Sequence, residues 1–378
     1  MNRELKAPKK LALLAILTIL SSSEVLAAKI KIGVVLPSSG STATFGIENA
    51  NGIKLAHKKL MSEKKAIDGL ELVFEDDKSE SVEATNAIRK LINIDKVSMV
   101  IGEVTSSNTL AMAPIAEEAK IPLFSPAATN AKVTQNKKFV SRACFTDDFQ
   151  GVVMARFAFN QLNANEAVIV VDNSQDYSKG LAESFKKEYL KLGGKLLSDD
   201  LFYMRKDMDF SSLLRRVKRL NPKAVFLPGY YEEVGLMIKQ ARQLGINVPF
   251  LGGDGWDSPD LFKIAGPAIK GNYISSHFAP DDTDPLVQNF VRDYEKAYGQ
   301  KPGAMAALGY DAYLIAIEAI KKSKTKSAQE INTHLLATKD FMGVTGKISI
   351  DAERNSKKAA VVLEATDKGF IFKNKVQP

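Results

Sequence analysis

The sequence has few of the residues that metal sites and nucleophilic catalysis require. Its 378 residues include one cysteine, one tryptophan and three histidines. A single cysteine excludes an intramolecular disulfide, so stability must come from packing; Cys144, with apolar neighbours, is predicted to be a buried thiol. The histidines, His57, His277 and His334, are scattered and form no sequence pattern that would bind a metal or activate a nucleophile. We therefore expect no enzymatic activity and no metal site.

Cofactor and nucleic-acid motifs are also missing. The loop at 37–41 lacks the glycine spacing of a dinucleotide-binding fold, and neither a Gly-Lys-Ser/Thr phosphate loop nor a Gly-x-Ser-x-Gly elbow occurs. The formal charge is +8, but the basic residues are spread out. Their densest cluster, 215–219, lies on an amphipathic segment without interleaved aromatics. We expect no cofactor and no nucleic-acid partner.

The N-terminus is typical of export. A basic segment precedes the apolar run 11–20, and small residues follow at Ala27 and Ala28. Ten apolar residues are too few to cross a bilayer, which needs about 20. No cysteine is near the cleavage site to carry a lipid. Residues 1–27 are therefore predicted to be a cleaved signal peptide, and the protein is expected in the periplasm.

From residue 29 onward, short β-branched runs alternate with longer segments of helical period. This alternation predicts an α/β protein with parallel sheets covered by helices. The predicted strands are 30–36, 70–75, 98–101, 121–124, 167–171, 195–202, 224–227 and 250–251, with late strands at 345–350 and 359–364. About 350 residues exceed what a single core usually holds, and the alternation restarts after residue 147. Two doubly wound lobes are therefore predicted.

The predicted lobes are discontinuous in sequence. Lobe 1 comprises 29–147 plus 279–352, and lobe 2 comprises 148–278 plus 353–378. Because no low-complexity linker is present, we expect the chain to cross between lobes in short ordered segments. The three candidates are 147–148, 276–280 and 351–356. Three such crossings would form a hinge that bends by small dihedral changes.

Small, polar or aromatic residues follow the carboxyl ends of several predicted strands, where open α/β sheets bind ligands. Hydroxyl groups beyond those needed for helix capping occur at 105–107, and a small polar turn spans 125–130. In the second half, loops carry tyrosines, an aspartate between glycines, and the only tryptophan. The candidate residues there are Tyr177, Tyr230, Asp254 and Trp256. Together these loops predict a cleft suited to a zwitterion.

These loops resemble the branched-chain amino-acid-binding (Leu/Ile/Val-binding) family of periplasmic ABC-transporter substrate-binding proteins, which has the type I periplasmic binding protein fold. The similarity covers essentially the whole chain after residue 28. It is most specific at Gly102 to Thr109, at 125–130, and at Gly-Tyr-Tyr followed by 240–245 and Gly-Asp-Gly-Trp. The resemblance implies a two-lobed monomer that delivers a small molecule to a membrane permease.

The resemblance also implies roles for individual residues. Ser106 and Thr129 would hold the ligand carboxylate, whereas the carbonyl of Ala127 and the acid Asp254 would hold its ammonium group. Tyr177 and Tyr230 match aromatics that touch the ligand, and Phe45 matches one that walls the side-chain pocket. For Trp256 only its position suggests a contact.

Two departures from the family pattern bear on specificity. Some members have a disulfide near the Ser-Ser motif, which a chain with one cysteine cannot form. The pocket acid is Asp254 where some relatives have the longer Glu. Binding of amides, urea or aromatic acids and a ligand-sensing role therefore stay open as alternatives, and an exported enzyme is the remaining class.

Overall fold

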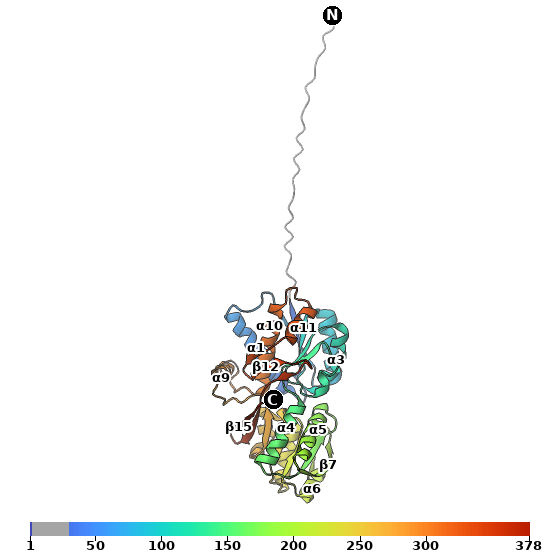
Figure 1. Cartoon of the computed structure of the whole chain (residues 1–378), viewed down its shortest axis with the longest axis vertical. Coiled ribbons are helices and arrows are strands. Elements are labelled where there is room, and N and C mark those ends of the chain that lie inside the picture. The colour runs from blue at the N-terminus through green and yellow to red at the C-terminus, as the bar shows by residue number, and fades with distance from the viewer. Residues whose placement is uncertain (2–29) are drawn as a thin grey trace.

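The computed structural model describes Met1 and residues 30–378, so nearly all of the predicted signal peptide, residues 1–27, lies outside the described residues. In Figure 1 the described chain forms an upper and a lower half, each a sheet with helices against it. The halves correspond to two sheets, one of five strands and one of seven. Within the described range, no helix combines the length and apolarity needed to cross a membrane.

The first sheet contains only parallel strands, in the order β2-β1-β3-β4-β5. Its strands are β1 Lys31–Leu36, β2 Glu71–Asp76, β3 Met99–Gly102, β4 Leu123–Ser125 and β5 Val140–Arg142. Apart from β2 and the first residue of β1, these strands are buried along their whole length, as parallel strands covered on both faces must be. We call this sheet with its helices lobe 1.

Six α-helices accompany the first sheet. They are α1 Ala43–Ser62, α2 Ser81–Lys90, α3 Ser106–Ala119, α9 Pro285–Tyr298, α10 Ala304–Lys322 and α11 Ala328–Leu336, with short helical segments at Leu91–Asp95 and Ala131–Val133. Helix α1 packs extensively on α10, and α2 packs on α3. Helix α9 begins at a proline whose preceding residue, Asp284, accepts a hydrogen bond from Leu286 N–H. Helices α9 to α11 thus complete a lobe begun more than 200 residues earlier.

The second sheet is mixed, in the order β15-β14-β10-β9-β8-β6-β7. Its strands are β6 Glu166–Asp172, β7 Lys195–Tyr203, β8 Ala224–Phe226, β9 Phe250–Gly252, β10 Tyr273–Ser276, β14 Ala360–Thr366 and β15 Gly369–Val376. Strands β6 to β10 are parallel, whereas the hairpin β14–β15 adds antiparallel to β10. The C-terminal segment therefore extends this second sheet. We call it, with its helices, lobe 2.

Five α-helices cover the second sheet. They are α4 Asp147–Arg156, α5 Asp176–Lys191, α6 Ser211–Leu220, α7 Tyr231–Gln243 and α8 Pro259–Ala265, with short helical segments at Phe157–Gln161, Asp254–Trp256 and Gly266–Ile269. The two lobes together confirm the predicted α/β architecture with parallel sheets and helices. The chain has further elements that the sequence pattern did not predict: α4, α8, α11, β5, β10, β11 Phe341–Gly343 and β13 Ser356–Lys357.

A small antiparallel sheet, β11-β12-β13, lies near the lobe junction, with β12 at Gly346–Ile350. Strand β13 is tied to lobe 1, because Ser356 Oγ donates to the carbonyl oxygen of Arg142 at 2.8 Å. The chain passes between the sheets after β5, after β10 and after β13. We propose that the crossings are 143–146, 277–284 and 358–359, close to the segments expected from the sequence.

Candidate functional site

The predicted site residues all follow the carboxyl ends of parallel strands. The segments after β1, β3 and β4, including the first turns of α1 and α3, carry Phe45, Ser106, Ala127 and Thr129 on lobe 1. The segments after β6, β8 and β9, including the first turn of α5, carry Tyr177, Tyr230, Asp254 and Trp256 on lobe 2. All eight are buried, with exposed fractions of 7% or less. A parallel sheet directs this edge toward its ligand, so the topology accounts for their gathering from six separate loops.

Ser106 is the first residue of α3, a helix of 14 residues. Its hydroxyl oxygen accepts a hydrogen bond from Asn130 N–H at 3.1 Å, so the hydroxyl hydrogen can serve a second acceptor. The helix start adds unpaired backbone N–H groups and a positive dipole end. This corner of lobe 1 is therefore suited to an anion such as a carboxylate.

The turn that contains Ala127 and Thr129 is braced by a buried arginine. The Arg142 guanidinium donates to the carbonyl oxygens of Ala128 and Asn130, at 2.7 and 2.8 Å. Thr129 contributes its carbonyl oxygen to Asp147 N–H at 2.9 Å, at the start of α4 in lobe 2. These hydrogen bonds fix the carbonyl and amide groups of the turn before any ligand arrives. The turn therefore loses little conformational entropy when a ligand binds.

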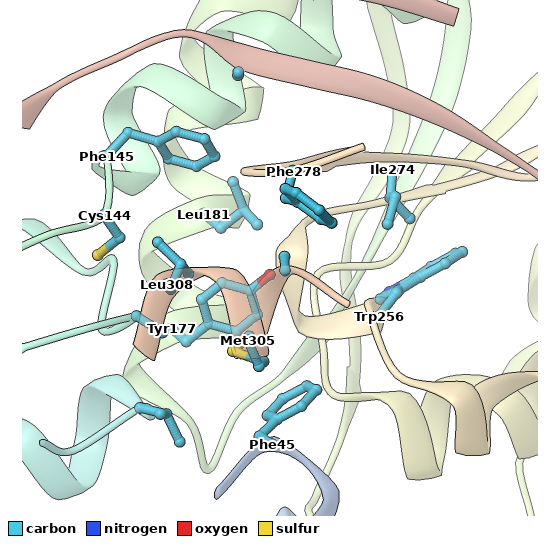
Figure 2. Close-up of a cluster of buried hydrophobic side chains, with 14 of the residues drawn as sticks. Phe45, Cys144, Phe145, Tyr177, Leu181, Trp256, Ile274, Phe278, Met305 and Leu308 are labelled. Carbon is cyan, nitrogen blue, oxygen red and sulfur yellow. The ribbon is translucent and has the colours of Figure 1, made fainter. Parts of the chain in front are cut away.

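Three aromatic side chains form a continuous wall across the lobes. The rings of Tyr177 and Tyr230 stack with centroids 5.2 Å apart and planes 11° apart. Tyr230 meets the lobe 1 residue Phe45 edge-on at 5.9 Å. In Figure 2, Tyr177 and Phe45 belong to the same buried cluster as Met305 and Leu308 of α10. The wall therefore faces apolar side chains that sequence reasoning had not assigned to the site.

Asp254 lies in a short helical turn directly after β9 and is 2% exposed. Its Oδ1 accepts from the Gln150 amide at 3.1 Å, and its Oδ2 is 3.0 Å from His277 Nε2. The turn depends on close backbone approach, since a Cβ on Gly255 would lie 2.5 Å from the Gly229 carbonyl oxygen. The glycines beside Asp254 therefore do what the sequence suggested: they present the acid in a tight turn.

A second carboxyl group, Asp147, shares the Gln150 amide with Asp254, at 2.8 Å. Burial and, to a smaller extent, the charge of Asp254 together raise the pKa of Asp147 to about 8. Burial also raises the pKa of the Tyr177 hydroxyl well above its usual range, again with Asp254 adding to the effect. Both groups are therefore kept protonated near neutral pH on the lobe 2 side of the site.

Trp256 is placed differently from the other seven residues. It is fully buried, its indole N–H donates to the carbonyl oxygen of Leu227 at 3.0 Å, and its ring covers Gly252. Figure 2 shows Trp256 apart from Tyr177 and Phe45 in that view. These contacts favour a packing role inside lobe 2, so we omit Trp256 from the proposed contact set.

The lobes also touch directly around these residues. The Ser107 hydroxyl is 3.0 Å from both the N–H and Oδ2 of Asp176, and the Asn130 amide donates to the Asp176 carbonyl oxygen at 2.7 Å. Further along the same junction, Arg205 Nη1 donates to the Ser79 carbonyl oxygen at 2.8 Å. The structure is therefore a closed arrangement of the two lobes.

Sequence reasoning missed the residues that support the site. Gln150, His277 and Arg142 are separated from the residues they hold by 104, 23 and 12 to 14 positions. The only signal for His277 was its place within a predicted crossing, 276–280. Long-range polar contacts of this kind leave no local pattern.

The arrangement favours binding over bond-making. Burial raises the pKa of the Cys144 thiol to about 12, so the side chain stays a thiol and is a poor nucleophile. Among the described residues, no group of three or more His, Cys, Asp or Glu side chains is placed to hold a metal ion. What the geometry offers is an anion corner, an acid and an aromatic wall.

Comparisons with known proteins agree with this architecture. The profile of the periplasmic binding protein family matches residues 29–368. "Leu/Ile/Val-binding protein homolog 1" of Brucella melitensis is 29% identical over 347 residues, covering 90% of this chain and 91% of that protein. The crystal structure of a leucine binding protein LivK from Thermotoga maritima is 40% identical, with a TM-score of 0.88, covering 92% of this chain and 99% of that one.

Two further solved structures were determined with ligands. The branched-chain amino acid transporter substrate binding protein LivJ from Streptococcus pneumoniae, in complex with isoleucine, is 34% identical with a TM-score of 0.87, covering 93% of this chain and all of that one. A solute binding protein of an ABC transporter from R. palustris, in complex with benzoate, is 25% identical with a TM-score of 0.84, covering 92% and 96%. Similar folds thus take ligands with and without an ammonium group.

Proposed function

The chain belongs to the periplasmic binding protein family, and we propose that it is the substrate-binding protein of an ABC importer for an amino acid with an aliphatic side chain. The ligand carboxylate would lie at Ser106 and Thr129, and its ammonium group between the Ala127 carbonyl and Asp254. The side chain would meet the aromatic wall. The protein would act as a monomer, in the periplasm, after removal of residues 1–27, and would present the closed form to a membrane permease without chemical change to the ligand.

The observation that carries the proposal is the burial of Asp254 and the nature of its hydrogen-bond partners. The carboxylate is buried, and the groups that touch its two oxygens are an amide and an imidazole. A buried charge is costly unless it is paired. A ligand ammonium would supply the missing positive charge, and a ligand of this kind would contact both lobes. It therefore favours the closed form by its differential affinity.

The side-chain preference rests on the apolar cluster. Phe45, Met305 and Leu308 are each buried, and Phe45 also meets Tyr231 edge-to-face at 4.9 Å. An aliphatic side chain placed here would exchange water for apolar contact, a gain of about 0.8 kcal/mol for each buried CH₂. The isoleucine complex of LivJ and the leucine binding protein LivK, both more than 30% identical, support the same class of ligand.

An aromatic acid is the second candidate. It is favoured by the stacked pair Tyr177 and Tyr230 and by the benzoate complex of a relative. Such a ligand has a carboxylate for Ser106 but no ammonium group for Asp254. It would leave the buried acid unpaired, and we therefore rank it second.

A thermal-shift screen of the mature protein tests the proposal. A ligand that binds only the native state raises the melting temperature by mass action. We expect leucine, isoleucine or valine to raise it, and benzoate, urea and short amides to have no effect. A shift with benzoate or an amide and none with any amino acid would contradict the proposed ligand class.

A further inference from the structure

His277 is a buried polar residue that is not among the proposed ligand contacts. It follows β10 directly, in the proposed second crossing, and is 2% exposed. Its Nε2 lies 3.0 Å from Asp254 Oδ2. Its ring stacks on Phe145 of the proposed first crossing, with centroids 3.6 Å apart and planes 23° apart. His277 therefore links the pocket acid to two of the segments that join the lobes, its own and the one that contains Phe145.

Asp254 is held from its other side by an amide that is itself fixed. Gln150 donates to both Asp254 and Asp147, and its carbonyl oxygen accepts from Ser275 Oγ at 3.0 Å. The orientation of the Gln150 amide follows, because its nitrogen faces two carboxyl groups and its oxygen faces a hydroxyl donor. The two oxygens of Asp254 are thus positioned by donors from two different elements.

The imidazole of His277 is neutral. Burial, opposed by Asp254 and assisted by the charge of Lys358, lowers the pKa of His277 to about 4. Among the described residues, Nδ1 is buried without a hydrogen-bond partner, so a proton there would be an unpaired buried donor. The single ring proton therefore belongs on Nε2, where it is donated to the Asp254 carboxylate.

A neutral donor differs from a cation in its effect on a carboxylate. A lysine or arginine at this position would orient Asp254 and also cancel its charge, which would remove the attraction for a ligand ammonium. The Nε2–H of a neutral histidine orients the group and leaves its charge available.

We propose that His277 is the positioning residue of the ammonium subsite: as the neutral Nε2–H tautomer it holds Asp254 toward the cleft without neutralising it, and so makes the site select ligands that carry an ammonium group. This inference rests on the proposed function. Through its stacking on Phe145, the same ring joins the ammonium subsite to the hinge.

Titration calorimetry with leucine on three variants tests the proposal. His277→Leu removes the donor and should weaken leucine binding by about 10- to 100-fold, the range for a hydrogen bond to a charged group. His277→Gln places an amide N–H near the Nε2 position and should restore affinity to within about fivefold of the wild type. His334→Leu, the same change on α11 in lobe 1, is the control and should leave affinity unchanged.

Nitrogen-15 NMR of the histidine side chains of the wild type is a second test. It reports the tautomer of His277 and its response to ligand, which a purely structural role would not predict. With three histidines in the chain, His277→Gln assigns the signal. We expect a neutral Nε2–H tautomer that does not titrate between pH 6 and 8, with a shift of its Nε2 signal on adding leucine. This reading decides the matter even if His277→Leu fails to fold.

The outcomes separate the two claims. If the wild type binds leucine and His277→Leu binds it equally well, or if His277 titrates between pH 6 and 8, the role of His277 is overturned and the proposed function stands. If the wild type binds no amino acid, the proposed function fails, and the inference fails with it.

Discussion

The Ser107 hydroxyl and Asp176 face each other across the two lobes, with Ser107 Oγ 3.0 Å from both the N–H and Oδ2 of Asp176. Each residue lies in the first turn of its helix, α3 in lobe 1 and α5 in lobe 2. The hydroxyl accepts from the N–H and donates to the carboxylate, so one side chain forms two bonds. Contacts of this kind exist only when the lobes are closed, and they set part of the balance between closed and open forms.

Removing this contact should weaken ligand binding without unfolding the protein. Ser107→Ala loses two hydrogen bonds of the closed form, each with a net value of about 0.5–1.5 kcal/mol, so leucine affinity should fall by about 5- to 100-fold. Calorimetry measures the change. Ser184→Ala is the matched control, because its hydroxyl donates to Asp148 within lobe 2. Equal losses in both variants would mean that the contact does not govern closure.

Asp254→Asn should strongly weaken the binding of amino acids. The substitution keeps the shape of the side chain but removes the charge that the ligand ammonium requires, and breaking a buried charge pair costs about 2–5 kcal/mol. Calorimetry with leucine provides the measurement, and Asp200→Asn, an exposed acid paired with Arg216, provides the control. Unchanged affinity in Asp254→Asn would remove this residue from the site.

Asp147→Asn should change how stability depends on pH. Since the folded pKa of Asp147 is raised to about 8, the folded protein binds more protons than the unfolded chain between about pH 4 and 8. This group therefore lowers the free energy of unfolding as pH rises through that range. We expect Asp147→Asn to gain about 3–4 kcal/mol relative to the wild type between pH 5 and pH 8.

Denaturant unfolding at pH 5 and at pH 8 measures this difference in the free energy of unfolding. The neighbouring exposed residue offers a control, Asp148→Asn, which should show no such difference. If Asp147→Asn and the wild type change in parallel between the two pH values, Asp147 is ionised in the folded protein.

Gly255→Ala should disturb both folding and binding. The added Cβ would lie 2.5 Å from the Gly229 carbonyl oxygen and 2.8 Å from a ring carbon of Tyr177, so backbone or ring must move. Overpacking of this kind costs about 1–3 kcal/mol. The melting temperature should fall, and leucine affinity should fall with it because the turn also positions Asp254. A variant with wild-type melting temperature and affinity would show that the turn is not tightly packed.

Much of the architecture could be predicted from the sequence because parallel strands buried on both faces appear as apolar β-branched runs. Strand β1 and strand β6 are of this kind. Strand β5, by contrast, has three residues and ends at Arg142, so it has neither the length nor the composition of a typical strand. Its pairing with β4 depends on tertiary contacts that a local pattern cannot report.

The site residues show the same difference between local sequence signals and tertiary contacts. Ser106, Thr129 and Asp254 follow strand ends, where polar and glycine-rich loops stand out in the sequence. His277 and Gln150 matter because they contact Asp254 in space, and each looks ordinary among its neighbours in the chain. The polar loop of Trp256 suggested a ligand wall, and in the structure its indole N–H donates to the Leu227 carbonyl oxygen.

We propose that the buried Asp254 selects a ligand with an ammonium group. The most direct measurement is calorimetry of leucine and of 4-methylpentanoate, which has the same carbon skeleton and carboxylate but no ammonium group, on the wild-type protein. We expect leucine to bind and 4-methylpentanoate to bind at least about 30-fold more weakly, since the buried charge would remain unpaired. Equal affinity for the two ligands would contradict it.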